Sequence, residues 1–390
     1  MHFDKHVTPR SLYVHWPFCP YRCHFCPFVA LAGQDELMGQ YHEALKQEII
    51  LFNADNQQPV LLETIFMGGG TPSTWPPVLL LDISGTLKKI YCIDSTTEWT
   101  LEVNPGTVDD HKLRVWKEAG INRLSIGVQS LNDTALTTLN RHQTIKSVYT
   151  LLDQAAPIFD NLSIDLILGL PGISAQAWRD TITTVVNWPI KHLSVYFLTV
   201  HETTPLYFAV QQDKIKLPFD DEQLVELYQW TVERLAEHGF EQYELSNFAR
   251  AGYRSRHNQA YWQHKPYKGF GLGACSFDGR SRSQNTKNIM RYMTTLEHAQ
   301  EPNDFYEQLT DEQLTLESLM LALRQKQGIT LAALAPKLKA PAYLLSTVQE
   351  LQQRKLLEYD GTSIRLTPAG FAVEHEVLLT LLKEKNISVI

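Results

Sequence analysis

The sequence predicts an α/β fold: a partial (β/α)6 barrel followed by a smaller helical, winged-helix-like C-terminal domain. Short apolar runs rich in β-branched and aromatic residues alternate with helical patterns, and most begin roughly 25–40 residues apart, as parallel strand–helix units do. Polar or glycine-rich segments directly follow several of these runs, where barrels carry their chemistry. From about residue 310 the pattern changes to closely spaced helices and a hairpin, which indicates a second domain.

The barrel strands are expected at residues 12–16, 64–68, 100–104, 123–128, 162–168 and 192–198. Several of them are nearly continuous apolar runs, which is typical of strands buried on both faces. Helical periodicity lies between and after them, at residues 38–52, 109–118, 132–139, 147–155, 175–188 and 222–238. We therefore assign residues 1–238 to the barrel.

The rest of the chain divides into a connecting segment, residues 239–300, and a C-terminal domain, residues 301–390. In that domain helices are expected at residues 314–324, 331–338 and 343–353, and Asp360-Gly361 between two alternating strands predicts a tight hairpin. Winged helices often bind DNA, but residues 311–390 contain nine basic and nine acidic residues. This balance argues against DNA binding and favours a packing or lid domain.

Composition excludes several classes of protein. Apolar residues make up 44% of the 390 residues and charged residues 20%, which is ordinary for a globular chain. The net charge of -8 argues against nucleic-acid partners and against attraction to anionic membranes. No apolar run approaches the ~18 residues of a membrane span, and the first residues lack the apolar stretch of a signal peptide. We expect a cytoplasmic protein.

The cysteines indicate a metal site. Cys19, Cys23 and Cys26 form a C-x3-C-x2-C motif just after the first expected strand. Three thiolates on a tight loop can hold three irons of a [4Fe–4S] cubane and leave the fourth iron without a protein ligand. Zinc is the alternative, with His24 completing a Cys3His set, but no second cysteine knuckle of a structural zinc site is present. The spacing favours the open-cornered cluster.

Further polar or glycine-rich groups follow the other strands and predict one pocket. Glycines permit close approach of the backbone to a ligand, an arginine can pair with a carboxylate, and an aspartate inside an apolar strand is costly without partners. Taken alone, the glycines are also explained by a tight turn, Glu102 by a solvated or salt-bridged carboxylate and Arg141 by an exposed loop. The position of Asp165 favours a site role, and together these residues lie on successive strand ends. The candidates are Gly69, Gly70, Thr71, Glu102, Gln129, Arg141 and Asp165.

The segment YVHWPFCPYRCHFCPF resembles the cluster loop of the radical S-adenosylmethionine (SAM) superfamily. The resemblance implies that SAM binds the open iron and that one-electron reduction cleaves it to a 5′-deoxyadenosyl radical. GGGTPS, GVQS, LNRHQT and DLILGLPG also keep the order and spacing of the oxygen-independent coproporphyrinogen oxidase family, over nearly the whole chain. By this resemblance Tyr13 packs beside the cluster, and the matching SAM positions are Phe25, Gly69, Gly70, Thr71, Glu102, Gln129, Arg141 and Asp165.

Three features favour the HemW branch of that family over the HemN enzymes. Phe28 stands where the enzymes usually carry a fourth cysteine, and the first strand begins too early for their N-terminal arm. The segment His257–Trp262 (HNQAYW) resembles the HNxxYW segment of HemW, a proposed haem-ligating site. A histidine can ligate haem iron, aromatic rings can flank the macrocycle, and Arg254 or Arg256 can pair with propionates. A satisfied core histidine is the alternative explanation for His257.

The leading hypothesis is a haem chaperone that carries a SAM-ligated [4Fe–4S] cluster and delivers haem to an acceptor protein. Such a protein needs an electron donor for its cluster, and contact with membrane haem proteins is consistent with it. The alternatives are oxidative decarboxylation of coproporphyrinogen III to protoporphyrinogen IX, another radical reaction on a tetrapyrrole such as haem breakdown, and a scaffold with a structural cluster. Cys92 and Cys275 are expected to be structural, with a contact of Cys275 to a bound ligand left open. The sequence does not determine the oligomeric state, the number of SAM molecules or covalent haem attachment.

Overall fold

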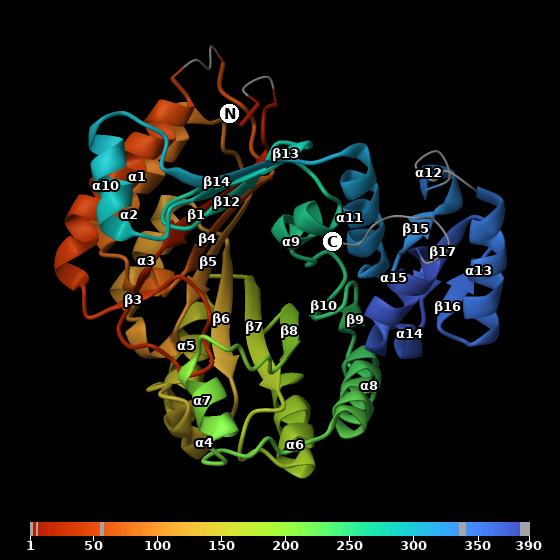
Figure 1. Cartoon of the computed structure of the whole chain (residues 1–390). Helices are drawn as coiled ribbons and strands as arrows, with labels where there is room; N and C mark the ends of the chain where they lie inside the picture. The colour runs from red at the N-terminus through yellow and green to blue at the C-terminus, as the bar shows by residue number, and fades with distance from the viewer. Residues whose placement is uncertain (1–2, 5–6, 55–57, 335–340, 383–390) are drawn as a thin grey trace.

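The computed structural model describes residues 3–4, 7–54, 58–334 and 341–382, and Figure 1 shows their arrangement. A nine-stranded sheet runs through the larger part of the molecule in the order β11-β1-β4-β5-β6-β7-β8-β10-β9. Its six central strands pair in parallel and confirm the predicted strands to within about two residues. They are β1 (Ser11–Trp16), β4 (Thr64–Gly69), β5 (Glu98–Val103), β6 (Arg123–Gln129), β7 (Asn161–Leu168) and β8 (His192–Phe197).

The helices of the larger part also lie where the sequence predicts them, with two additions, α2 and α7. In α3 the side chain of Asp109 accepts a hydrogen bond from Lys112 N, and Gly120 ends the helix in the left-handed conformation. The helices of this part are α1 (Met38–Phe52), α2 (Pro77–Ile90), α3 (Asp110–Ala119), α4 (Asp133–Thr138), α5 (Ile145–Ala155), α6 (Ala175–Val185), α7 (Pro205–Gln211) and α8 (Asp221–Glu237). Together with the sheet they enclose the larger of two apolar cores.

The connecting segment contains strands that the sequence does not reveal. Three of them extend the central sheet: β9 (Glu241–Gln242) and β10 (Asn247–Ala249) beside β8, and β11 (Lys268–Phe270) in parallel beside β1. Because the outer strands β11 and β9 do not pair with each other among the described residues, the barrel is partial, as predicted. The rest of the segment forms two helices, α9 (Arg256–Trp262) and α10 (Ile289–Glu297), and two strands of a separate antiparallel sheet, β12 (Cys275–Phe277) and β13 (Ser281–Asn285). The third strand of that sheet, β14 (Asn303–Gln308), lies in the range assigned to the C-terminal domain.

The C-terminal elements form a smaller lobe with its own apolar core (Figure 1). The predicted hairpin is present, and Gly361 in its turn has a φ of 90°. Only residues 331–334 of the helix expected at 331–338 lie within the described residues. The elements are α11 (Asp311–Leu323), β15 (Ile329–Thr330), α12 (Leu331–Leu334), α13 (Pro341–Gln353), β16 (Leu357–Tyr359), β17 (Ser363–Leu366), α14 (Pro368–Ala372) and α15 (Glu374–Leu382).

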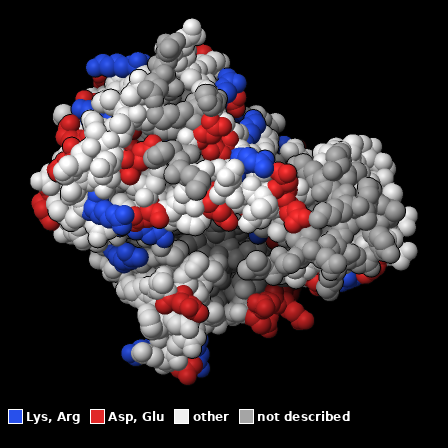
Figure 2. Space-filling model, turned by 45° about the horizontal axis from the view of Figure 1, so that its top comes forward, with Lys and Arg blue, Asp and Glu red and all other residues white. Residues whose placement is uncertain are grey.

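On the face shown in Figure 2, basic and acidic side chains are intermixed rather than gathered into one basic patch. Of the helices in the described ranges, none combines the length and the apolar character that crossing a bilayer requires.

A buried network of hydrogen bonds and one ion pair holds the glycine-rich segment GFGLGA, residues 269–274, against the barrel. The carboxylate of Glu48, on α1, accepts hydrogen bonds from Gly271 N at 2.8 Å, Asn285 Nδ2 at 2.7 Å and Tyr292 Oη at 2.5 Å. The ammonium of Lys268 lies 3.8 Å from the same carboxylate, and both side chains are buried. Burial raises the pKa of Glu48 and lowers that of Lys268. These contacts join α1, α10, β11 and β13 at one point.

Replacement of Glu48 by alanine is expected to lower the free energy of unfolding by about 3–5 kcal/mol, because Lys268 is then buried without a counter-charge. Chemical denaturation measures the effect. Glu43→Ala, on the same helix but exposed, is the control and should change stability by less than about 1 kcal/mol. A Glu48→Ala protein as stable as this control would contradict the assigned role of the network.

Candidate cluster and cofactor site

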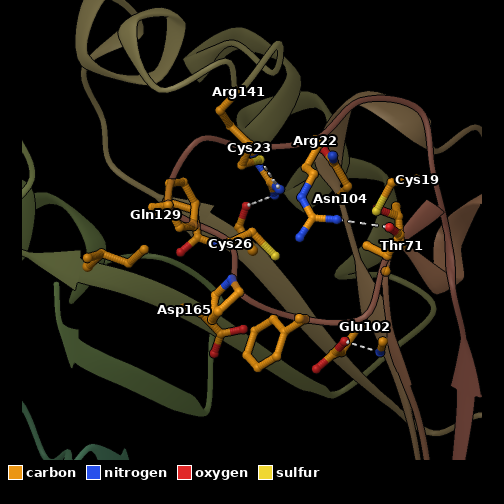
Figure 3. Close-up of a pocket in the computed structure, with 18 of the residues that line it drawn as sticks. Cys19, Arg22, Cys23, Cys26, Thr71, Glu102, Asn104, Gln129, Arg141 and Asp165 are labelled. Carbon is orange, nitrogen blue, oxygen red and sulfur yellow. Dashed lines mark hydrogen bonds between the residues drawn. The ribbon is translucent and has the colours of Figure 1, made fainter. Parts of the chain in front are cut away.

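A cavity of about 360 Å³ opens at the carboxyl ends of the parallel strands, where the sequence analysis placed the pocket. Figure 3 shows the three cysteines and Arg141 along one side of this cavity, with Glu102 and Asp165 on the other. We call it the cluster cavity. It brings together eleven of the predicted site residues: Cys19, Cys23, Phe25, Cys26, Gly69, Gly70, Thr71, Glu102, Gln129, Arg141 and Asp165.

The glycine turn after β4 packs directly against the start of the cysteine loop. Gly70 N donates to Trp16 O at 2.8 Å, and Thr71 N donates to Phe18 O at 2.9 Å. A further hydrogen bond joins Cys19 Sγ and Thr71 Oγ1 at 3.1 Å. A Cβ on Gly70 would lie 2.4 Å from Pro17 O and 3.0 Å from Cys19 Sγ, so that only glycine fits here.

The three cysteine side chains line the cluster cavity without forming one compact ligand group. Four ligands around one zinc at about 2.3 Å have sulfur atoms less than about 4 Å apart. Within the described ranges, the one ligand group whose atoms all lie within 4.8 Å of one another is His42, Glu43 and Asp82, and the cysteines do not form such a group. Three thiolates from one loop are the ligand set expected for a cubane with one open iron.

Two of the three thiols, Cys19 and Cys26, are held in an environment that disfavours the bare thiolate. Burial raises the pKa of Cys19 to about 11, and burial also raises that of Cys26. Metal ligation requires the thiolates, so the cysteines lose their protons as the metal binds. Arg141 Nη1 lies 3.7 Å from Cys23 Sγ and supplies one positive charge beside the loop.

Arg141 and Gln129 are fixed by the backbone at the end of β6. Arg141 Nη2 donates to Gly127 O at 2.8 Å, and its Nε donates to Gln143 Oε1 at 2.9 Å. The register between β6 and β7 shifts at Gly127/Gln129, and Gln129 has a φ of 65°, in the left-handed region that non-glycine residues seldom adopt. This strained bulge turns the Gln129 side chain to the cavity wall.

Two buried carboxyl groups form the opposite wall. Glu102 Oε2 accepts a hydrogen bond from Gly69 N at 3.1 Å, and Asp165 Oδ2 accepts one from Ser125 Oγ at 3.2 Å. Burial, and then the charge of Asp165, raises the pKa of Glu102 to about 8. Burial likewise raises the pKa of Asp165. Groups so perturbed in a cleft are typical of functional sites.

The cavity also contains residues that the sequence analysis missed. Asn104, whose Nδ2 donates to Tyr21 Oη at 2.8 Å, follows β5, and Ser125 lies within β6. Tyr196 and Phe197 reach the cavity from the end of β8. The rule that chemistry lies at strand ends, applied to the sixth strand as to the others, would have found Tyr196 and Phe197.

Tyr13 lines a neighbouring cavity of about 380 Å³, which we call the second cavity. The two cavities share four residues, Pro27, Phe28, Gly69 and Glu102, and so adjoin each other. The other lining residues of the second cavity are His15, Val29, Tyr261, Tyr267, Gly273, Ala274, Cys275, Gln284 and Lys287.

His257, the expected haem ligand, is enclosed by protein. Only 1% of its surface is exposed, and its ring stacks on Phe66 with the centroids 5.1 Å apart. Nδ1 lies 2.8 Å from Thr64 Oγ1, and Nε2 lies 2.9 Å from Tyr261 Oη, so both ring nitrogens have hydrogen-bond partners. Burial lowers the pKa of His257 to about 3.

The arginines expected beside haem also have partners in the protein. Arg256 donates through Nη1 to the carbonyl of Thr96, and Arg254 Nη2 lies 3.6 Å from Glu241 Oε2. From the HNQAYW segment, Tyr261 lines the second cavity, and the other five residues line neither that cavity nor the cluster cavity.

Comparison with known proteins agrees with this architecture. The radical SAM superfamily model matches residues 13–185, and the HemN C-terminal domain model matches residues 309–373. Coproporphyrinogen III oxidase (HemN) from Escherichia coli, described as a radical SAM enzyme, superposes with a TM-score of 0.83 at 25% identity, over 96% of this chain and 90% of that one.

Similarity to curated sequences extends over nearly the full length. The heme chaperone HemW of Bacillus subtilis is 34% identical, over 96% of this chain and 100% of that protein. The heme chaperone HemW of Synechocystis is also 34% identical, over 93% and 89% of the two chains. The mitochondrial radical S-adenosyl methionine domain-containing protein 1 of Mus musculus is 33% identical, over 97% and 88%. With its cysteine loop, strand-end pocket and C-terminal domain in the same order, the chain belongs to the HemW family of the radical SAM superfamily.

Proposed function

We propose that this protein is a haem chaperone, which binds haem and passes it to an acceptor protein. The full-length similarity to proteins named heme chaperone HemW carries this proposal. The protein acts in the cytoplasm, receives an electron for its cluster from a donor protein, and delivers haem to acceptors that include membrane-bound ones.

The residues that line the cluster cavity are evidence for a [4Fe–4S] cluster with Cys19, Cys23 and Cys26 as its ligands. When bound there, the cluster and SAM supply one-electron chemistry. Around them the chain contributes close backbone at Gly69 and Gly70, two carboxyl groups and the guanidinium of Arg141. A donor-rich wall on one side and carboxyl groups on the other suit a ligand with both a carboxylate and hydroxyl groups, such as SAM.

The second candidate function is the decarboxylation of coproporphyrinogen III, because the structure resembles that of HemN. Phe28 is the observation against it: where the enzymes usually carry a further thiol, this chain has an aromatic side chain, 66% exposed at the mouth of the cavity. Mass spectrometry of an anaerobic reaction with reductant, SAM and coproporphyrinogen III separates the two. Repeated loss of two CO2 per substrate molecule, with matching 5′-deoxyadenosine, would identify an oxidase.

A transfer assay tests the chaperone function. The haem-loaded protein is mixed with a haem-free acceptor, and the absorption of the reconstituted acceptor is followed over time. We expect transfer faster than the spontaneous loss of haem from this protein, measured with an inert haem scavenger in place of the acceptor. Equal rates with acceptor and scavenger would show passive release and contradict delivery.

Cluster assembly should depend on each cysteine and on the glycine turn. Cys19→Ala, Cys23→Ala and Cys26→Ala should each reduce bound iron and sulfide to a small fraction of the parent value, because a three-ligand site has no spare ligand. Gly70→Ala should also reduce bound iron and sulfide, because the added Cβ would collide with Pro17 O and displace the cysteine loop. Gly85→Ala, on α2 with open space around it, is the matched control. Parent-level iron and sulfide in all the cysteine variants would refute the metal assignment.

Replacement of Glu102 by glutamine should weaken SAM binding and stabilise the SAM-free protein. The unfolded chain ionises this group near pH 4.5 and the folded chain near pH 8, so the parent loses stability as the pH rises between these values. The gain in melting temperature on Glu102→Gln should be close to zero at pH 4 and largest above pH 8. Scanning calorimetry and SAM titration measure both effects, with Glu118→Gln on exposed α3 surface as the control. An equal gain at both pH values would contradict the assigned ionisation.

A further inference from the structure

The second cavity has the chemistry of a site for a flat, anionic, aromatic ligand. Its walls include the rings of Tyr13, Phe28, Tyr261 and Tyr267, and Tyr261 and Tyr267 meet edge to face with centroids 4.6 Å apart. Aromatic walls favour a planar macrocycle through stacking and apolar contact. At about 380 Å³ the cavity encloses part of a tetrapyrrole and leaves one edge of it near solvent.

A positive charge lies at the wall of the same cavity. Lys287 is exposed and lines the cavity, and in the described part of the chain no carboxylate forms an ion pair with it. Its ammonium is therefore available to a ligand carboxylate. A tetrapyrrole whose ring lies among the tyrosines can present its propionates to this lysine.

The HNQAYW segment contributes to this cavity through Tyr261 rather than through His257. Tyr261 lies on the cavity wall, whereas His257 is buried behind it on α9. The hydrogen bond of 2.9 Å between Tyr261 Oη and His257 Nε2 fixes the phenol, and the hydrogen bond of 2.8 Å between Thr64 Oγ1 and Nδ1 fixes the imidazole. Ligation of iron by His257 would require the loss of one of these bonds and the opening of the core around Phe66.

We propose that the second cavity binds the haem, with Tyr261 and Lys287 in contact with it, and that His257 is a positioning residue that holds Tyr261. This inference rests on the proposed function, because it names where the cargo lies. It also places the haem beside the cluster cavity, since Glu102, Gly69 and Phe28 belong to the walls of both. SAM or the cluster can then influence haem release through shared residues.

Haem titration of the full, cluster-loaded protein, followed by absorption spectroscopy, tests the contacts. Lys287→Glu and Tyr261→Phe should each weaken haem binding about tenfold, the first through charge reversal and the second through loss of the hydrogen bond to His257 that fixes the ring at the cavity wall. The controls are Lys214→Gln and Tyr149→Phe, two exposed residues outside both cavities. If His257 were the ligand, Tyr261→Phe would free its Nε2 and strengthen binding instead.

Two replacements of His257 test the positioning role. The amide of His257→Gln can still bond to Tyr261 Oη, so this variant should keep the absorption spectrum of the parent–haem complex and most of its affinity. His257→Leu cannot form that bond and should bind haem more weakly. Two results together would overturn the inference. The two His257 variants would change the haem spectrum in the same way, and Lys287→Glu and Tyr261→Phe would bind haem as tightly as the parent.

The outcomes separate this inference from the proposed function. A parent protein that binds no haem would contradict the chaperone function itself. A parent that binds haem with an affinity unaffected by Lys287→Glu and Tyr261→Phe would retain the function and place the haem elsewhere. Because these two substitutions lie at a cavity wall, they test whether haem binds in the second cavity even if the core variants of His257 fail to fold.

Discussion

The contact between the glycine turn and the cysteine loop is the constraint on which the candidate site depends. The loop leaves β1 at Trp16 and must present three sulfur atoms to the edge of the barrel where the other strands end. Two backbone hydrogen bonds from Gly70 and Thr71 hold the beginning of the loop there, at a distance that excludes any side chain at residue 70. The position of the cysteine loop relative to Glu102 on β5 is thus set by the main-chain geometry of the neighbouring parallel strands β1, β4 and β5.

The site is assembled at a cost to stability. Glu102 and Asp165 both lie in surroundings where burial opposes their ionised forms, and the positive charge of Arg123 only partly offsets this. Arg123 is itself fully buried, and its Nε has no hydrogen-bond partner. A core built for stability alone would not contain this set of charges, whereas a site that must recognise a polar cofactor requires them.

The HNQAYW segment shows how the fold changes the role that a residue can play in ligand binding. A histidine next to aromatic residues and arginines is chemically suited to haem, and the sequence suggests that use. In the fold, α9 turns His257 into the interior and Tyr261 to the second cavity, while the arginines bind Thr96 and Glu241. The Glu48 network holds Gly271, which directly precedes the cavity-lining stretch that contains Gly273, Ala274 and Cys275, against α1 and α10.

The sequence by itself determined the barrel strands, most of its helices, the C-terminal hairpin and eleven of the residues that line the cluster cavity. These features depend on local periodicity, on turn chemistry and on the rule that parallel strands end at one edge of a sheet. All three can be applied to short stretches of the sequence. The tertiary structure alone decided what long-range pairing controls. It placed β11 beside β1, formed the β12–β14 sheet, divided the site into two adjoining cavities, and buried His257. Which side chain of a motif faces a ligand depends on the elements packed around it. His257 is enclosed by Thr64 and Phe66, and Thr64 lies 193 residues before it in the chain. Such a contact follows from the tertiary structure and not from the local sequence.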